Sequence, residues 1–136
     1  KLFFDKLGYT FETEFNGKPL IETLLTPTRI YVKLFKALKS HINALAHITG
    51  GGIVENLPRV LPEGLKAQVY KSKIKTLPVF DFMSQYVEES EMHRTFNMGV
   101  GMILVVSPEN VDAVLANSDG YVIGELVEGE RSAVML

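Results

Sequence analysis

A run of three glycines directly after a short apolar segment constrains the fold of this chain more than any other feature. Residues 42–48 are apolar enough for a buried strand, and residues 50–52 must then turn the chain. Residues 53–59 can begin a helix, which Pro58 limits to about two turns. Glycine permits positive φ angles and close approach to a ligand, while the first N–H groups of a helix are unpaired. The pattern predicts a strand, a turn and a helix start, which together can hold phosphate.

A glycine run after a strand also occurs in tight turns that bind nothing. Polar side chains on both sides of this run favour a binding site: His47, Thr49, Glu55, Asn56 and Arg59. We expect the backbone of the glycines, assisted by Thr49, to hold an anion. His47 is the candidate for proton transfer or for steering a phosphoryl group, because histidine exchanges a proton near neutral pH. The alternative for His47 is a structural, hydrogen-bonded residue.

Three separated segments resemble one enzyme family. They are His47–Arg59, Leu24–Val32 and Arg94–Met102, and they occur in the family's order. The family is phosphoribosylformylglycinamidine cyclo-ligase, also called aminoimidazole ribonucleotide synthetase. The resemblance covers nearly the whole chain, whereas the family's amino-terminal Asp- and Gly-rich nucleotide and metal motifs are absent. It implies that residues 1–136 form a single carboxy-terminal domain, with residues 1–20 as the end of an inter-domain helix and a linker.

The resemblance also implies an activity, which is ATP-dependent closure of formylglycinamidine ribonucleotide to aminoimidazole ribonucleotide in purine biosynthesis. ATP and Mg²⁺ would be bound mainly by the amino-terminal domain, and the full-length enzyme would be a cytoplasmic homodimer. We expect the isolated chain to be inactive. His47 is the catalytic candidate, and no residue is assigned as a metal ligand. The residues expected to bind substrate or phosphate are Thr49, Gly50, Gly51, Gly52, Asn56, Arg59, Arg29, Asn97 and Gly99.

Other interpretations stay open at this point. The chain could belong to another member of the same superfamily, such as a selenophosphate synthetase or a thiamine-phosphate kinase, or be a non-catalytic module that binds phosphate or a partner. Arg29 fits an ordinary salt bridge as well as a site, and Arg59 could be structural. Asn97 and Gly99 would also suit a plain turn before a strand. Glu55 alone is poor evidence for a metal site.

Composition excludes some classes of function. The net charge of −2 and the lack of a Lys/Arg run argue against nucleic acid and against a membrane surface. No apolar stretch approaches the roughly 18 residues of a transmembrane helix. Cysteine is absent, which fits a reducing compartment.

The hydrophobic pattern predicts alternating strands and helices. Strands are expected over 42–48, 65–74, 102–106 and 121–127, with an edge at 131–136, and residues 9–20 are expected to be a loop. Helices are expected over 1–7, 20–25, 32–40, 53–59, 78–87, 88–94 and from an N-cap at Ser107 to about 117. The aromatic and methionine side chains of 78–87 are predicted core, and His41 and His93 are predicted surface residues. With the resemblance, this order indicates an α+β fold of three α/β/α layers, a mixed sheet with helices on both faces, partly ferredoxin-like.

Overall fold

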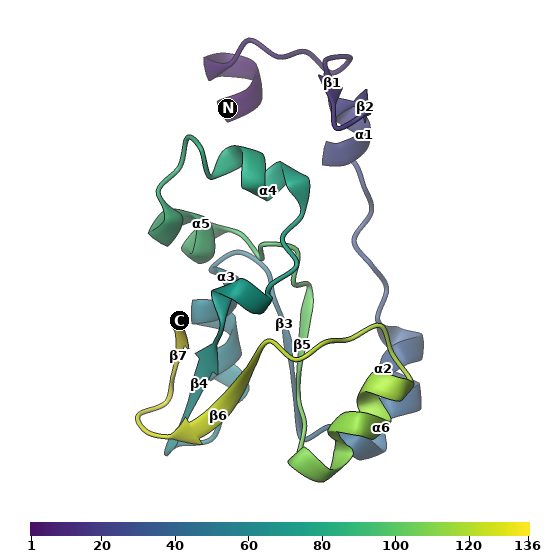
Figure 1. Ribbon diagram of the computed structural model, residues 1–136, viewed down its shortest axis with the longest axis vertical. Coiled ribbons are helices and arrows are strands. Elements are labelled where there is room, and N and C mark those ends of the chain that lie inside the picture. The colour runs from purple at the N-terminus through teal and green to yellow at the C-terminus, as the bar shows by residue number, and fades with distance from the viewer.

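A two-stranded antiparallel ladder runs through the middle of the protein, seen in a computed structural model that describes residues 1–136 (Figure 1). It pairs β3 (Ala44–His47) with β5 (Met102–Val105), placing Ala44 opposite Val105 and His47 opposite Met102. One end of the ladder therefore holds the start of β3 and the end of β5. The opposite end holds the glycine run after β3 and the Gly-x-Gly segment before β5.

Helices occupy the end of the ladder away from the glycines. α2 (Val32–Leu38) precedes β3 and α6 (Val111–Ala116) follows β5, and Figure 1 shows them together at the lower right. The α6 helix begins later than predicted because Pro108–Asn110 forms a 3-10 turn first. Ser107 makes no side-chain cap; its hydroxyl and its N–H both contact Oδ1 of Asn43, at 3.0 and 2.9 Å.

A second sheet has three strands of mixed direction. Its central strand β4 (Leu65–Val69) pairs antiparallel with β6 (Gly124–Glu128) and parallel with β7 (Ser132–Met135). The strand predicted to reach residue 74 is shorter because Lys71–Lys73 forms a 3-10 turn. The strand predicted from residue 121 pairs only from Gly124 onward. A β-carbon there would lie 2.0 Å from the carbonyl oxygen of Gln68, so glycine permits this close pairing.

The main core lies between the two sheets and is closed by a short helix, α3 (Gly52–Asn56), and the 3-10 turn Leu57–Val60 that follows it. Ile53 and Leu57 are 2% and 3% exposed, and burial of each side chain contributes roughly 1.5–3 kcal/mol. The core contains apolar residues in or next to β3, α3, β4, β5 and β7: Ala46, Ile48, Ile53, Leu57, Leu61, Ala67, Val69, Val100, Ile103 and Ala133.

The amino-terminal part forms a smaller, aromatic cluster. A single π-helical turn, Leu2–Lys6, is followed by a hairpin of β1 (Glu14–Phe15) and β2 (Lys18–Pro19) and by α1 (Leu20–Leu24). The prediction of a loop over 9–20 is wrong in part, because β1 and β2 pair as a short hairpin. Its turn lies at Asn16 and Gly17, which both have positive φ.

Helix α4 (Pro78–Met83) packs on this aromatic cluster, and α5 (Glu89–Thr95) follows it. The rings of Phe3 and Phe82 stack with their centroids 5.6 Å apart. No α4 residue is fully buried, so the predicted core stripe is a half-buried contact surface. The α+β class and the mixed strand directions are confirmed, with the strands in three separate sheets. No helix has the length and apolar character needed to cross a membrane.

Candidate functional site

The glycine run makes the turn from β3 into α3. Gly51 and Gly52 have φ angles of +95° and +60°, a region that side chains other than glycine disfavour. The N–H of Gly52 donates to the carbonyl oxygen of Thr49 at 3.1 Å, which closes the turn. Gly50 has no such requirement, because its φ is ordinary and nothing lies within 4 Å of its β-carbon position. Two of the three glycines are therefore explained by the turn itself.

Asn56 stabilises this turn through hydrogen bonds to its backbone carbonyl groups. Its side chain is buried, and its Nδ2 donates to the carbonyl oxygens of Gly52 at 2.7 Å and Gly50 at 3.2 Å, with that of Thr49 at 3.5 Å. The side-chain amide of Asn56, which was predicted to bind substrate, is thus already hydrogen-bonded within the protein. The arrangement gives Asn56 the task of fixing the shape of the turn.

The groups of this turn that face solvent are Thr49 and Gly50, whereas Gly52 is buried. The buried side of Gly52 faces the end of α5, where its β-carbon position is 2.0 Å from the carbonyl oxygen of His93. Arg94 of α5 pairs with Glu55 of α3 at 3.5 Å, Nε to Oε1. An anion at this turn would therefore meet the backbone near Thr49 and Gly50.

A second glycine turn lies beside the first. Asn97 shapes it, accepting the Gly99 N–H on Oδ1 at 3.0 Å and the Val100 N–H on its carbonyl oxygen at 2.8 Å. Met98 and Gly99 both have positive φ, at +54° and +95°. The N–H of Ile48 donates to the carbonyl oxygen of Gly101 at 3.0 Å and joins the two turns. The ladder thereby brings together two motifs that are about fifty residues apart in the sequence.

Two histidines differ from one another in their setting. His47 ends β3 beside the first turn and is exposed, so a ligand at the turn can reach it. His93, predicted to be a surface residue, is half-buried with its side chain 16% exposed. Burial lowers the pKa of His93 below its ordinary value, and the positive charge of Lys71 adds to this effect while Glu89 opposes it.

The two predicted arginines do not lie on the glycine turns. Arg59 is exposed and follows α3, at the end opposite the first turn. Arg29 forms two hydrogen bonds to the Asp119 carboxylate, at 2.5 and 2.9 Å, and this pair raises the pKa of the guanidinium and lowers that of the carboxyl. Arg29 therefore forms a salt bridge, one of the two alternatives left open for it, and its role as a ligand site stays a prediction.

Sequence reasoning missed the residues around Arg29. Its guanidinium lies over the ring of Tyr31, 5.6 Å from the centroid, and the Tyr31 hydroxyl is 2.2 Å from the β-carbon position of Gly101. The segment with Arg29 therefore reaches the second glycine turn through Tyr31. Asp119 follows Arg29 by 90 residues, and no spacing in the sequence signals that pairing.

Three or more His, Cys, Asp or Glu side chains do not gather anywhere in a geometry that could hold a metal ion. Glu55, the one carboxylate considered for such a role, instead contacts Arg94.

Comparison with known proteins decides the family. The family described as "AIR synthase related protein, C-terminal domain" matches residues 5–136. The chain belongs to this family. The match confirms the resemblance seen in the three sequence segments.

Several bacterial proteins named phosphoribosylformylglycinamidine cyclo-ligase are similar to this chain. A phosphoribosylformylglycinamidine cyclo-ligase of Caldanaerobacter subterraneus subsp. tengcongensis is 43% identical over 145 positions, which cover 99% of this chain and 43% of the relative. Those of Thermoanaerobacter sp. and Streptococcus pneumoniae are 42% and 43% identical, covering 99% and 100% of this chain. The chain thus spans less than half the length of these AIR synthase relatives.

Proposed function

We propose that this chain acts as the carboxy-terminal domain of an ATP-dependent cyclo-ligase that converts formylglycinamidine ribonucleotide to aminoimidazole ribonucleotide in purine biosynthesis. The observation that supports this role best is the meeting of two glycine turns at one end of the β3–β5 ladder. Both turns lie in segments that resemble the cyclo-ligase family. Each presents polar backbone and an adjacent polar side chain to solvent.

Within this function we assign different tasks to the two turns. Thr49 and the glycine backbone beside it would bind an anionic group of the substrate, and Asn97 with Gly99 would bind the neighbouring part. His47 would transfer a proton or orient the reacting group, since it is exposed beside the first turn. Asn56 would act by fixing the backbone. Arg59 and Arg29 lie away from the two glycine turns, so they would contact only a part of the substrate that extends past these turns.

The carboxylates of this chain do not fit a magnesium site, because they form no cluster that could bind the ion. We therefore place Mg²⁺ and most contacts with ATP in the part of the cyclo-ligase relatives that this chain does not span. The same part would supply the domain partner and the contacts of a homodimer. A cytoplasmic location and the absence of nucleic-acid and membrane partners complete the proposal.

A chimera tests the proposed function. The matching part of the Caldanaerobacter relative is replaced by this chain, and ATP-dependent formation of aminoimidazole ribonucleotide is measured. We expect activity from the chimera and none from this chain alone. A folded chimera that forms no product, while the unmodified relative does, would contradict the proposal and favour a non-catalytic binding module.

A further inference from the structure

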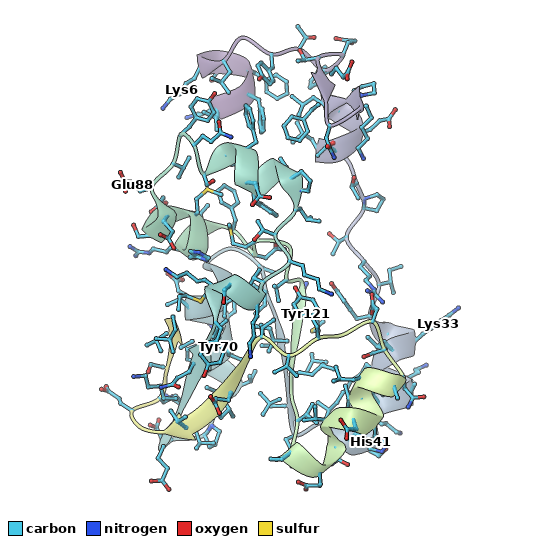
Figure 2. The ribbon with its side chains drawn as sticks, in the orientation of Figure 1. Lys6, Lys33, His41, Tyr70, Glu88 and Tyr121 are labelled. Carbon is cyan, nitrogen blue, oxygen red and sulfur yellow. The ribbon has the colours of Figure 1, made fainter.

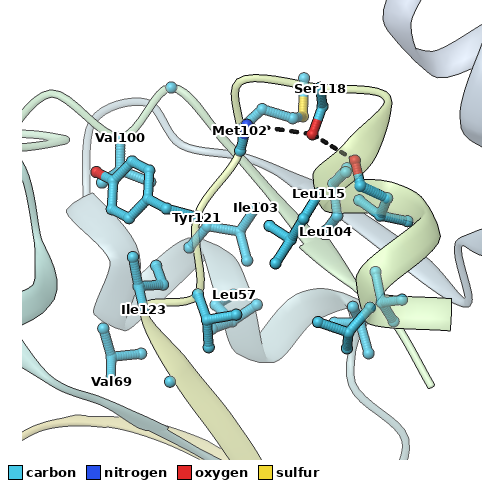
Figure 3. Close-up of a pocket in the computed structure, with 18 of the residues that line it drawn as sticks. Leu57, Val69, Val100, Met102, Ile103, Leu104, Leu115, Ser118, Tyr121 and Ile123 are labelled. Carbon is cyan, nitrogen blue, oxygen red and sulfur yellow. Dashed lines mark hydrogen bonds between the residues drawn. The ribbon is translucent and has the colours of Figure 1, made fainter. Parts of the chain in front are cut away.

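Residues 118–123 form an irregular strap between α6 and β6, and Figure 1 shows it crossing the β3–β5 ladder. The strap is one wall of a cavity of about 410 Å³, and β5 contributes to another wall. Most of the lining is apolar, and Figure 3 shows side chains of Ile103, Leu115 and Ile123 turned toward the cavity. Gly99 and Gly101 also line this cavity. The strap therefore closes a space that reaches the second glycine turn.

The backbone of the strap is bonded almost only at its two ends. The Tyr70 N–H donates to the carbonyl oxygen of Ile123 at 2.8 Å, which is the one backbone–backbone hydrogen bond of residues 118–123. At the other end, the Ser118 hydroxyl donates to the carbonyl oxygen of Val114 at 2.7 Å and accepts the Gly120 N–H at 3.1 Å. A segment with so few backbone hydrogen bonds opens at a lower cost in free energy than the core does.

Two side-chain contacts hold the middle of the strap. Arg29 binds the Asp119 carboxylate through two hydrogen bonds, and the Tyr121 hydroxyl accepts the Lys75 N–H at 3.1 Å. The Lys75 ammonium also lies 4.5 Å from the centroid of the Tyr121 ring. The side chains of Arg29 and Asp119 are 53% and 66% exposed, and such exposed ion pairs contribute little free energy. Both contacts can therefore break while the core stays folded.

The charged groups of the cavity wall balance one another. Arg29 and Lys75 contribute two positive charges, and Asp119 and Glu125 contribute two negative charges. Glu125 has its own partner, because it accepts the Tyr70 hydroxyl at 2.6 Å. Figure 2 shows Tyr70 and Tyr121 at separate places in the molecule. The strap is thus held by its specific contacts, and no excess charge of the wall attracts or repels it.

We propose that residues 118–123 open and close as one unit over the apolar cavity, and that the Arg29–Asp119 pair is the latch that favours the closed state. Only Gly120 separates Asp119 from Tyr121, so release of the latch also loosens the contact between Tyr121 and Lys75. Opening moves Tyr121 and Ile123 out of the cavity wall and gives solvent access to the second glycine turn from that side. This inference goes beyond the proposed function and does not depend on it.

The test is native-state hydrogen exchange of the 136-residue chain, followed by NMR. The amides of Lys75 and Tyr70 report on the strap, because their acceptors are the Tyr121 hydroxyl and the Ile123 carbonyl oxygen. We expect these two amides to exchange at similar protection and to be less protected than Ile48, whose N–H donates within the ladder to Gly101.

Asp119→Ala should speed exchange of the Lys75 and Tyr70 amides by the same factor, about two- to fivefold for loss of an exposed ion pair. Exchange of the Ile48 amide should stay as it is, because the ladder does not open with the strap. Asp119 bonds to neither reporting amide, so a shared acceleration requires the strap to move as a unit.

Glu63→Ala is the matched control. Glu63 pairs with Arg131 at 2.9 Å on the surface, but neither residue lines the cavity, so its loss should leave both reporting amides unchanged. An effect of Asp119→Ala on neither or on only one of the two amides would overturn the proposal. Equal acceleration of Ile48, or the same acceleration in Glu63→Ala, would also overturn it. Activity of the chimera bears on the proposed function alone.

Discussion

The carbonyl oxygen of His93 lies 2.0 Å from the position that a β-carbon on Gly52 would take. The start of α3 and the end of α5 therefore touch through bare backbone. This contact fixes the first glycine turn against the rest of the protein, and it makes Gly52 a structural requirement.

Gly52→Ala should lower the free energy of unfolding by more than about 2 kcal/mol, because the new methyl group meets backbone and the φ of +60° is strained for alanine. Gly50→Ala is the control and should change stability by less than about 0.5 kcal/mol, since its surroundings are open. Urea denaturation of both variants measures the difference. Equal stability of the two variants would show that the turn is not packed as described.

Asn56→Ala should cost about 1–3 kcal/mol of stability, because it leaves carbonyl groups of the first turn without their donor in a buried setting. Asn117→Ala offers a comparison, since Asn117 also donates to a carbonyl, that of Ala113 at 2.8 Å, but is exposed. The loss of stability in Asn117→Ala should be near zero. If thermal denaturation found the two losses alike, the role given to Asn56 would be wrong.

Stability should fall as the pH drops below the ordinary histidine value of 6.5. The folded-state pKa of His93 is lowered, mainly by burial, so between that pKa and 6.5 the unfolded state binds more protons than the folded state. Folding stability therefore rises with pH across this window. His93→Gln should flatten the slope measured by denaturation between pH 5 and 7. An unchanged slope would count against a buried, neutral His93.

Gly101→Ala tests the contact between the second glycine turn and Tyr31. The added β-carbon would lie 2.2 Å from the Tyr31 hydroxyl but 3.2 Å from the ring carbon that bears it. Tyr31→Phe should therefore reduce the cost of Gly101→Ala, with a coupling energy of about 0.5–3 kcal/mol in a double-mutant cycle. Additive effects would mean that Tyr31 does not pack against Gly101.

The sequence predicted those features that local chemistry decides. Three consecutive glycines indicated a turn, and two of them take positive φ. Strand ends were less predictable, because no glycine or proline in residues 70–74 marks an end, yet β4 stops at Val69 and the chain enters a 3-10 turn. In the same way, Pro108 marked a helix start three residues before α6 begins.

The composition of the site was predictable only in part. The motifs indicated both turns, but the hydrogen bond between Ile48 and Gly101 that joins them depends on strand pairing. Asn56 donates to carbonyl oxygens of its own turn, four and six residues before it, whereas Arg29 pairs with Asp119 across 90 residues. Residue type suggested ligand binding for both Asn56 and Arg29, and packing gave each a partner within the chain.

The most direct test of the proposed site compares two histidines of the chimera that contains this chain. His47 ends β3 at the glycine turns, whereas His41 precedes β3 at the opposite end of the ladder. His47→Ala should lower kcat for ring closure by a factor on the order of 10²–10⁴, the usual contribution of a group that transfers a proton, with an unchanged melting temperature. His41→Ala should leave kcat as it is. An unchanged kcat in His47→Ala would contradict the account and remove His47 from the chemistry.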